Sequence, residues 1–369
     1  TSKVEYLTGT IENNKTLNLS GSIGKTVSGN GTTYVANSLT FKDGADIVST
    51  LNLSNGAVLS TSGNADSSYA IGTLTGNGEV NVTTGSLQID NNAALNNLAN
   101  DGKTNIGGTL AAANNITNTN ELTVNGKVSA KDVTNSGTLT LKNDADIHNL
   151  TNENTVLISG NADVNNIINN KHMSVDGNLN VAVDVKNTDT LTVKKDLNVT
   201  GNITTSKTLD VTGSVSAANL TNEGSVSVGG TLTVSGDVSN TNTITVVGKV
   251  IAEDVTNSGN LTFRNGAEIN DFINNGSAYI TGSTSANNIT NNEEKIFNIT
   301  GDVIAQNITN KGDMDITGNA AAEVLISNSA ALDVTGTLTT VDFTNNGTAN
   351  ISENLISTGI LNNTDALTV

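Results

Sequence analysis

The most constraining feature of the sequence is a short unit that recurs to the C-terminus, and residues 133–152 contain one whole copy of it. In this copy, apolar residues come in pairs separated by one residue, Leu139 with Leu141 and Ala145 with Ile147. A third pair is mixed and joins Leu150 to Asn152. Residues two apart in an extended strand point to the same side. Each pair therefore predicts a short strand with two inward side chains, and three such strands make one turn of a coil.

The mixed pair sets the period of the repeat. From Leu98 with Asn100 onward it returns every 17 or 18 residues, with a single interval of 19 between Asn291 and Asn310. Thr205 takes the place of asparagine once. The asparagines of the mixed pair are Asn100, Asn118, Asn135, Asn152, Asn169, Asn187, Asn222, Asn240, Asn257, Asn274, Asn291, Asn310, Asn328, Asn345 and Asn362.

This pattern predicts an all-β fold, a single-stranded triangular parallel β-helix (β-solenoid) with 17–18 residues per turn. Each interval divides into steps of about six, six and five residues, one for each strand and corner. Apolar residues two apart do not make the stripe of an α-helix, and a disordered chain lacks sustained apolar periodicity. Turns about 4.8 Å apart would make about twenty turns into a rod on the order of 100 Å long. Aromatic residues are only 2% of the chain, which indicates a narrow interior filled by aliphatic rows.

The recurring asparagines share the inward phase of the apolar pairs, so we expect them to be buried. A stack of side-chain amides can donate to and accept from the amides of neighbouring turns, and can also bond backbone groups at the corner. A buried amide without partners would cost about 1–3 kcal/mol. The asparagines therefore predict a structural ladder that fixes the register between turns, and a ligand-binding role for this row is disfavoured.

The repeat is not equally regular along the chain. Residues 1–96 show the pairs at uneven spacings, for example Leu39 with Phe41 and Leu51 with Leu53, and Gly-rich segments separate them. Three of the four tyrosines also lie there. We therefore expect a less regular N-terminal part of the same solenoid over 1–96, followed by regular β-helix repeats over 97–369.

Charge and composition narrow the possible partners. The chain has 35 acidic and 17 basic residues and a net charge of −18, which argues against electrostatic binding to nucleic acid or anionic lipid. No run of about 18 apolar residues is present, so we expect no membrane insertion by this segment. The absence of cysteine excludes disulfides and thiolate metal sites.

The sequence predicts no catalytic residue, no cofactor and no metal site. His148 and His172 lie in different repeats without a metal-binding spacing, and we interpret them as exposed polar residues. Acidic residues on adjacent turns leave a calcium or acid/base site open as an alternative, although scattered surface acids are the simpler interpretation. These residues are Asp144, Asp146, Asp163 and Asp184.

Two further alternatives concern the outward residues. The residue after the apolar member of the mixed pair is often threonine, and a regular threonine row can bind ice, but Ile168, Lys186 and Ile273 interrupt it. Threonine is also simply a good strand residue. Sequons for N-glycosylation occur at Asn115, Asn219, Asn288 and Asn307, as chance alone produces in a chain so rich in Asn and Thr.

The phrase LTNEGSVSVGGTLTVSGDVSNTNTITVVG (220–248) repeats the order apolar, Thr, Asn, x, Gly, x and then alternating apolar residues. Its cadence resembles the haemagglutinin-type repeats of filamentous haemagglutinin and of autotransporter passenger domains, well over about 98–369 and weakly before. The resemblance implies a right-handed β-helix on a bacterial surface that acts in adhesion, aggregation or biofilm formation. Turns of 17 residues with an asparagine corner also favour this hand over left-handed hexapeptide helices, which usually keep a regular 18.

These observations predict a structural or adhesive extracellular or cell-surface rod. The alternatives are a glycan-active β-helix enzyme and a β-helix that binds ice, calcium or sugar. The first residues do not form a secretory signal and the last ones, from Leu367 to Val369, lie inside a repeat. We therefore expect either a piece of a longer exported stalk or subunits that associate end to end, and a surface receptor or glycan is the other expected partner.

Overall fold

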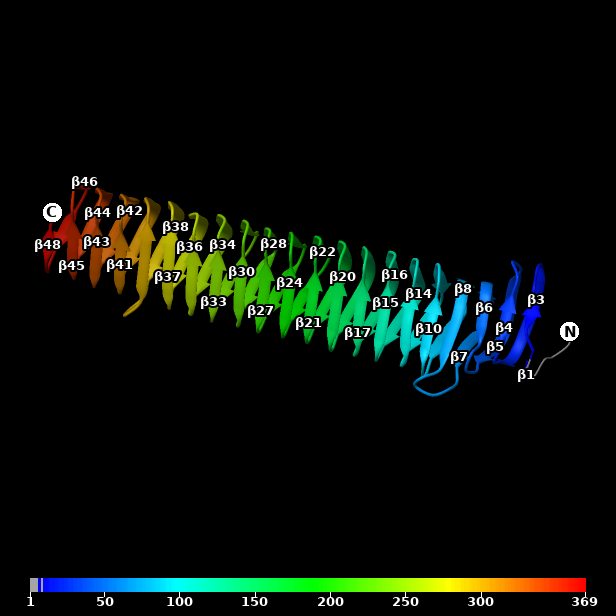
Figure 1. Cartoon of the computed structure of the whole chain (residues 1–369). Coiled ribbons are helices and arrows are strands. Elements are labelled where there is room, and N and C mark those ends of the chain that lie inside the picture. Colours follow the sequence, from blue (N-terminus) through cyan, green and yellow to red (C-terminus); the bar gives the residue numbers. More distant parts are fainter. Residues whose placement is uncertain (1–5, 8) are drawn as a thin grey trace. The chain divides into compact units, whose positions relative to one another are not determined.

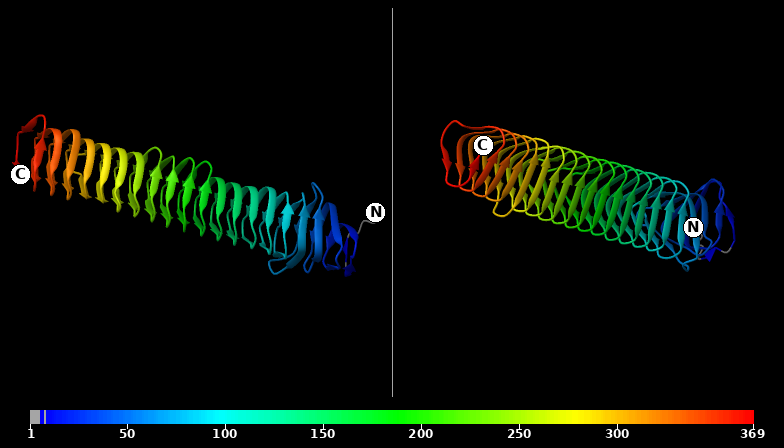
Figure 2. Two further views of the ribbon diagram at one scale, coloured as in Figure 1. Left: turned by 90° about the horizontal axis from the view of Figure 1, so that it is seen from above. Right: turned by 60° about the vertical axis from the view of Figure 1, so that its left-hand side comes forward.

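The structure, a computed structural model, describes residues 6, 7 and 9–369, and strands but no helix occur among them. Contacts divide the chain into two compact units, Thr1–Ala182 and Val183–Val369. In both units, consecutive turns pair through parallel strands, as Figure 1 shows for the arrows lying side by side in each unit. The backbone of each unit winds as a continuous coil (Figure 2). The predicted all-β parallel β-solenoid is therefore confirmed.

One turn of unit 1 illustrates the regular repeat. Its first side is the strand Thr138–Leu141, and the following strand, Ala145–Asn152, bends to supply the second side at its start and the third side at its end. Leu139 and Leu141 are buried on the first side, and Ala145 with Ile147 on the second. The inward pairs thus stack on the pairs of the neighbouring turns, and each buried aliphatic side chain of the size of Leu or Ile contributes about 1.5–3 kcal/mol.

The strands of unit 1 fall into an irregular and a regular set. The first set is β1 (Tyr6–Leu7), β2 (Ile11–Glu12), β3 (Thr16–Ile23), β4 (Thr26–Ser28), β5 (Thr32–Phe41), β6 (Asp46–Leu53), β7 (Val58–Thr61), β8 (Ser68–Gly76), β9 (Glu79–Val82), β10 (Ser86–Ile89) and β11 (Ala93–Leu95). The second set is β12 (Asn97–Asn100), β13 (Lys103–Ile106), β14 (Leu110–Asn118), β15 (Glu121–Val124), β16 (Val128–Asn135), β17 (Thr138–Leu141), β18 (Ala145–Asn152), β19 (Thr155–Ile158), β20 (Ala162–Asn169), β21 (His172–Val175) and β22 (Leu179–Val181).

Unit 2 repeats the regular pattern. Its first side consists of β24 (Thr190–Val193), β27 (Thr208–Val211), β30 (Ser225–Val228), β33 (Thr243–Val246), β35 (Asn260–Phe263), β37 (Ser277–Thr281), β39 (Ile296–Thr300), β41 (Asp313–Ile316), β43 (Ala331–Val334), β45 (Thr348–Ile351) and β48 (Leu367–Thr368). Its second and third sides consist of β23 (Val185–Asn187), β25 (Leu197–Val199), β26 (Asn202–Thr205), β28 (Val215–Ala217), β29 (Asn219–Asn222), β31 (Leu232–Val234), β32 (Val238–Asn240), β34 (Val250–Asn257), β36 (Ala267–Asn274), β38 (Thr284–Asn291), β40 (Val303–Asn310), β42 (Ala320–Asn328), β44 (Leu338–Asn345), β46 (Leu355–Ser357) and β47 (Leu361–Asn363).

The alternation between 17 and 18 residues arises mainly at the corner between the second and third sides. In β18 the step from Ala145 to Leu150 takes five residues and the strand continues through the bend. From Leu197 to Ile203 the step takes six, and the two sides are separate strands, β25 and β26. A six-residue step inside one strand instead shifts the register, as between Ala112 and Asn115 of β14. The extra residue is therefore absorbed locally and the columns of inward side chains continue.

The turns before residue 97 are less uniform. Residues paired across consecutive turns lie 16 apart for Tyr6 with Ser22 but 24 apart for Asp46 with Ala70. The loop between β7 and β8 projects from the coil in Figure 1. Phe41 and Tyr69 fill the interior beside it, with ring centroids 6.4 Å apart. Aromatic rings thus fill the wide turn at this loop.

Candidate functional site

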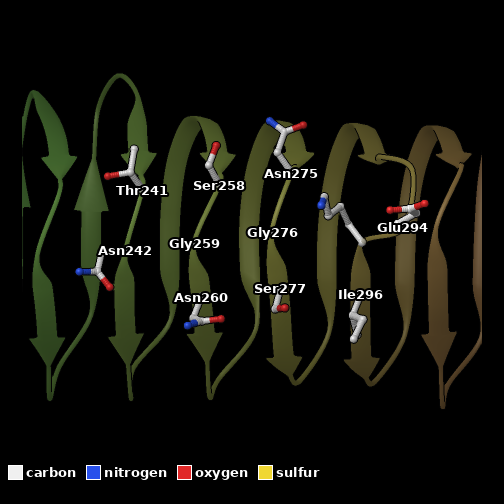
Figure 3. A pocket seen from close by; sticks show the side chains of 11 residues that line it. Thr241, Asn242, Ser258, Gly259, Asn260, Asn275, Gly276, Ser277, Glu294 and Ile296 are labelled. Carbon is white, nitrogen blue, oxygen red and sulfur yellow. The ribbon is translucent and has the colours of Figure 1, made fainter.

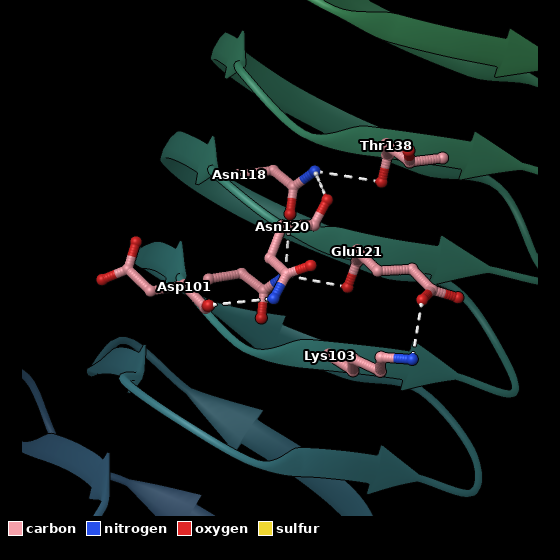
Figure 4. Close-up of polar contacts among 7 residues, drawn as sticks. Asp101, Lys103, Asn118, Asn120, Glu121 and Thr138 are labelled. Carbon is pink, nitrogen blue, oxygen red and sulfur yellow. Dashed lines mark hydrogen bonds and ion pairs between the residues drawn. The ribbon is translucent and has the colours of Figure 1, made fainter. Parts of the chain in front are cut away.

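The inward asparagines form the most extensive polar arrangement in each unit. The side-chain Nδ2 of Asn118 donates to Oδ1 of Asn135 in the next turn at 2.7 Å, to the carbonyl of Asn120 at 3.2 Å and to the carbonyl of Thr138 at 3.0 Å. Figure 4 shows the last contact and the neighbouring strands. The Oδ1 atom of Asn118 accepts from Nδ2 of Asn100 at 2.7 Å. Each amide therefore joins two turns and satisfies carbonyls at the corner that follows the third side, which we call the ladder corner.

The predicted ladder residues from Asn100 to Asn345 are buried in this way, with side-chain bonds of the ladder in unit 1 from Asn100 to Asn169 and in unit 2 from Asn222 to Asn345. In unit 2 Asn187 donates to the hydroxyl of Thr205 at 3.0 Å. Asn362 is wrong. The structure pairs Leu361 with Phe343 and places Asn363 on Asn345, whose Nδ2 donates to Oδ1 of Asn363 at 2.7 Å. The step from Leu355 to Leu361 takes six residues rather than five, and Asn362 points outward beside Thr344.

The ladder in unit 1 begins with a residue that the sequence pattern did not single out. Asn100 lies beside Val82 of the preceding turn, which has no amide to donate. Instead, the hydroxyl of Thr104, buried in a column otherwise occupied by Leu87 and Leu122, donates to Oδ1 of Asn100 at 2.7 Å. A polar residue at an otherwise apolar inward position, four residues after the first ladder asparagine, was the signal that could have identified this contact.

The other two corners carry polar ladders as well, which sequence analysis missed. Between the first and second sides, a carboxylate or amide oxygen accepts the backbone N–H one turn later, as Asp144 from Asn161 at 2.8 Å and Asp302 from Asn319 at 2.8 Å. Between the second and third sides, side chains bond directly, as Asn149 to Asp132 at 2.6 Å. Asp, Asn and Ser alternate at these positions and are partly exposed, so no single residue type marks them in the sequence.

The sequons lie largely in these ladders. Asn219 donates to Asn202 at 2.8 Å, Asn288 donates to Asp271 at 2.7 Å, and Asn307 donates to Asn288 at 2.9 Å. A glycan on Nδ2 would remove one of the hydrogens that these amides carry. The outward threonines stack in register, for example Thr134 beside Thr117 and Thr151, and isoleucines such as Ile168 stand 41% exposed in the same row.

The acidic residues that sequence analysis considered contact neighbouring turns, and all of them except the half-buried Asp144 are exposed. Asp163 accepts from Asn180 at 2.8 Å, Asp146 pairs with Lys127 at 3.8 Å, and Asp184 accepts the backbone N–H of Asn202 at 2.7 Å. His148 and His172 are exposed. Among residues 6, 7 and 9–369, no three His, Cys, Asp or Glu side chains gather as metal ligands would.

Two carboxyl groups have raised pKa values. Burial, and then the charge of Asp90, raises the pKa of Asp46, which lines an open hollow of about 350 Å³ on the first side of unit 1 with Ser68 and Gln88. In unit 2, burial and then the charges of Asp333 and Asp313 raise the pKa of Asp315. A second open hollow, of about 380 Å³, lies at the ladder corner of unit 2 around Gly259 and Gly276.

Comparisons with known proteins found no match, so the fold and these contacts describe the chain. No family model matches it, and no curated protein or solved structure matches it. The described residues include no helix long and apolar enough to cross a membrane. The chain is therefore described by class, as a parallel β-solenoid whose corners are joined by polar side-chain ladders.

Proposed function

We propose that the chain is a structural or adhesive part of an extracellular or cell-surface protein, that it mediates adhesion, aggregation or biofilm formation, and that it is not an enzyme. The observation that carries this proposal is the use of polar side chains at all three corners. Polar side chains that could serve chemistry elsewhere bond a neighbouring turn instead, as Asn118, Asp144 and Asn149 do. The inward residues are thus committed to stacking, and the outward residues remain for contact with other surfaces.

Charge and surface chemistry support the same role. A net charge of −18 keeps an elongating array of turns soluble and repels nucleic acid. The chain has no cysteine, so non-covalent contacts hold the turns together, which suits repeat proteins whose stability sums over neighbouring turns. The resemblance to haemagglutinin-type repeats supports display on a bacterial surface.

The carboxylates favour a scaffold over a glycan-cleaving enzyme. Hydrolysis of a glycosidic bond uses two carboxyl groups that flank the bond. Asp144 and Asp184 instead accept backbone N–H groups of the following turn, so their charge stabilises the coil.

The test is display of the chain on a bacterium that does not aggregate. We expect faster settling of the culture and greater retention on glass or epithelial cells than for the same strain displaying an unrelated β-solenoid of equal length. Antibodies against the chain should also label intact cells of the native host. Equal settling and equal retention for the two strains would overturn the adhesive role, and labelling only after lysis would overturn the extracellular location.

A further inference from the structure

The longest ladder corner of unit 2 borders an open hollow. In this corner the step from Asn291 to the next inward residue, Phe297, takes six residues, whereas Asn274 is followed by Ala278 after four. The two additional residues make this corner project beyond its neighbours at Glu294. Among the described residues, Glu294 is the non-glycine residue with a positive φ, which is 61°. Such a backbone conformation is strained for a residue other than glycine. The ladder is kept, because Nδ2 of Asn291 donates to the carbonyl of Lys295 at 3.0 Å.

The floor of the hollow consists of two glycines from consecutive turns. A Cβ on Gly259 would lie 2.0 Å from the carbonyl oxygen of Asn242, and a Cβ on Gly276 would lie 2.2 Å from that of Gly259. A side chain at either position would require the backbone of the neighbouring turn to shift, and with glycine at both the floor stays bare. Figure 3 shows Ser258 and Asn275 on one side of the glycines, Asn260 and Ser277 on the other, and Glu294 beyond Gly276.

Four of the polar side chains around this floor are uncommitted, unlike those of the ladders, whereas Asn275 accepts a hydrogen bond from Asn292. Within the described chain, the hydroxyls of Ser258 and Ser277, the amide of Asn260 and the carboxylate of Glu294 make no hydrogen bond or ion pair. Together they offer hydroxyls that donate and accept, an amide that does both, and a carboxylate that accepts from two directions. Ile296, which pairs with Ser277 in the neighbouring turn, lines the same hollow and is 38% exposed.

We propose that this hollow binds a neutral saccharide of one or two rings. A pyranose presents hydroxyl groups around its edge and C–H groups on its faces, and it needs both donors and acceptors at its edge with an apolar surface beside it. The four uncommitted groups supply the former, and the side chain of Ile296, which lines the hollow, supplies the latter. The volume of about 380 Å³ fits a ligand of this size. Glu294 and Lys295 both line the hollow and offset each other's charge, so it is the net charge of −18 of the chain that disfavours sialylated and sulfated sugars.

For its biological meaning this proposal rests on the adhesive role proposed above, but its test uses the purified chain. Saturation-transfer NMR with lactose, maltose, cellobiose, chitobiose and sialyllactose should detect binding of at least one neutral disaccharide. We expect a Kd on the order of 1 mM, because an open hollow leaves much of the ligand in water. Glu294→Gln and Ser277→Ala should each weaken that binding about tenfold, through the loss of one hydrogen bond.

Matched variants separate the hollow from the rest of the surface. Thr348→Ala changes the residue in the same column as Ser277, and Glu323→Gln neutralises another exposed carboxylate, so both should bind as the parent chain does. Deletion of Glu293 and Glu294 leaves Asn291, Asn292 and Lys295 in the same order as residues 169–171 and should abolish binding.

Three results would overturn the proposal: no binding of any neutral disaccharide, binding of sialyllactose alone, or equal binding by the parent, Glu294→Gln and Ser277→Ala. The two point variants decide the matter even if the deletion fails to fold. If the chain binds no saccharide but still aggregates cells, the saccharide site is wrong and the adhesive role belongs to other outward residues. If it binds a saccharide but does not aggregate cells, the saccharide site stands and the adhesive role is wrong.

Discussion

The column that carries the ladder differs between the two parts of unit 1. Before residue 97 it is occupied by Ile23, Phe41, Thr61 and Val82, which pair with one another in consecutive turns, and from Asn100 onward by asparagine. In the first part, the distance along the chain from this column to the next buried residue of the first side varies, from four residues between Phe41 and Ala45 to eight between Thr61 and Tyr69.

In the laddered part the corresponding step is constant. It takes four residues from Asn118 to Leu122 and four again in each following turn of unit 1. The asparagine amide explains this, because its Nδ2 bonds the carbonyl two residues later in its own turn and a carbonyl in the next. The comparison teaches that in unit 1 the amide holds its corner at four residues, whereas an apolar residue at the same position only fills space.

The 291–297 corner in unit 2 shows what happens when a laddered corner is lengthened. Asn291 keeps its bond to Asn310 at 3.0 Å but takes the carbonyl of Lys295 in place of one two residues away. The wider interior is filled by Phe297, which stacks on Phe272 with ring centroids 4.7 Å apart. A longer corner and a larger inward side chain occur together here, as they do around Phe41 and Tyr69 in the irregular part.

Removal of one rung should have the largest effect. Asn135→Leu leaves the carbonyls of Gly137 and Thr155 and the amide of Asn118 without their partner, and we expect a loss of about 3 kcal/mol in the free energy of unfolding. Urea denaturation measures the loss, and faster hydrogen exchange at Thr155 should localise it to this corner.

The control for this variant is Thr134→Val, which alters the adjacent outward residue and should change stability by less than about 0.5 kcal/mol. A loss below about 1 kcal/mol for Asn135→Leu would mean that corner length is set by the backbone alone. The contrast between the two parts of unit 1 would then lose its physical basis.

Sequence reasoning reached the fold and one ladder because both depend on a fixed period. Inward pairs and asparagines recur at 17 or 18 residues, and nothing else in the chain explains that constancy. Sequence reasoning failed where two assignments of the inward positions fit the pattern equally well. The segment from Ile360 to Asn363 contains two adjacent apolar residues and then two asparagines, and only the six-residue step from Leu355 selects Asn363.

Contacts that join different residue types escaped prediction for another reason. Thr104 acts at one turn only, and the corner ladders use Asp, Asn and Ser interchangeably because each supplies one acceptor oxygen. The hollow at Gly259 depends on how far the 291–297 corner projects from the coil, and the spacing of residues in the sequence does not give that. The boundary at 96/97 and the hand of the coil stay predictions.

The start of the ladder offers the next test. Thr104→Val keeps the shape of the side chain but removes the hydroxyl that bonds Oδ1 of Asn100, so we expect a loss of about 2 kcal/mol in urea denaturation. Thr284→Val in unit 2 is the matched substitution, because the buried hydroxyl of Thr284 has no partner within the described chain. It should raise stability by about 1 kcal/mol. The same sign for both would show that burial alone, not the ladder contact, governs these threonines.

Repair of the interrupted rung should give a smaller gain. Thr205 accepts from Asn187 but has one hydroxyl hydrogen, so it cannot make the three contacts of an amide. The corner from Thr205 to Leu209 already has the four-residue length of a laddered corner. We therefore expect Thr205→Asn to raise the free energy of unfolding by about 1 kcal/mol. Thr204→Asn, at the neighbouring outward position, should leave it unchanged, and a loss for Thr205→Asn would indicate that this corner is closed to an amide.

The smallest effect concerns carboxylates, which stack in register like the asparagines but repel. Burial first, and then Asp333 and Asp313, raises the pKa of Asp315 above the ordinary 3.8. A raised pKa means that the folded chain holds this proton more tightly than the unfolded chain, so stability falls as pH rises from about 3.8 through the raised pKa. Because Asp315 is exposed, the change should be a few tenths of a kcal/mol. Asp315→Asn should flatten the pH dependence of the urea midpoint in this range, as Asp46→Asn should in the irregular part. An unchanged slope for Asp315→Asn would show that outward columns, unlike the inward one, do not register the charge of the neighbouring turn.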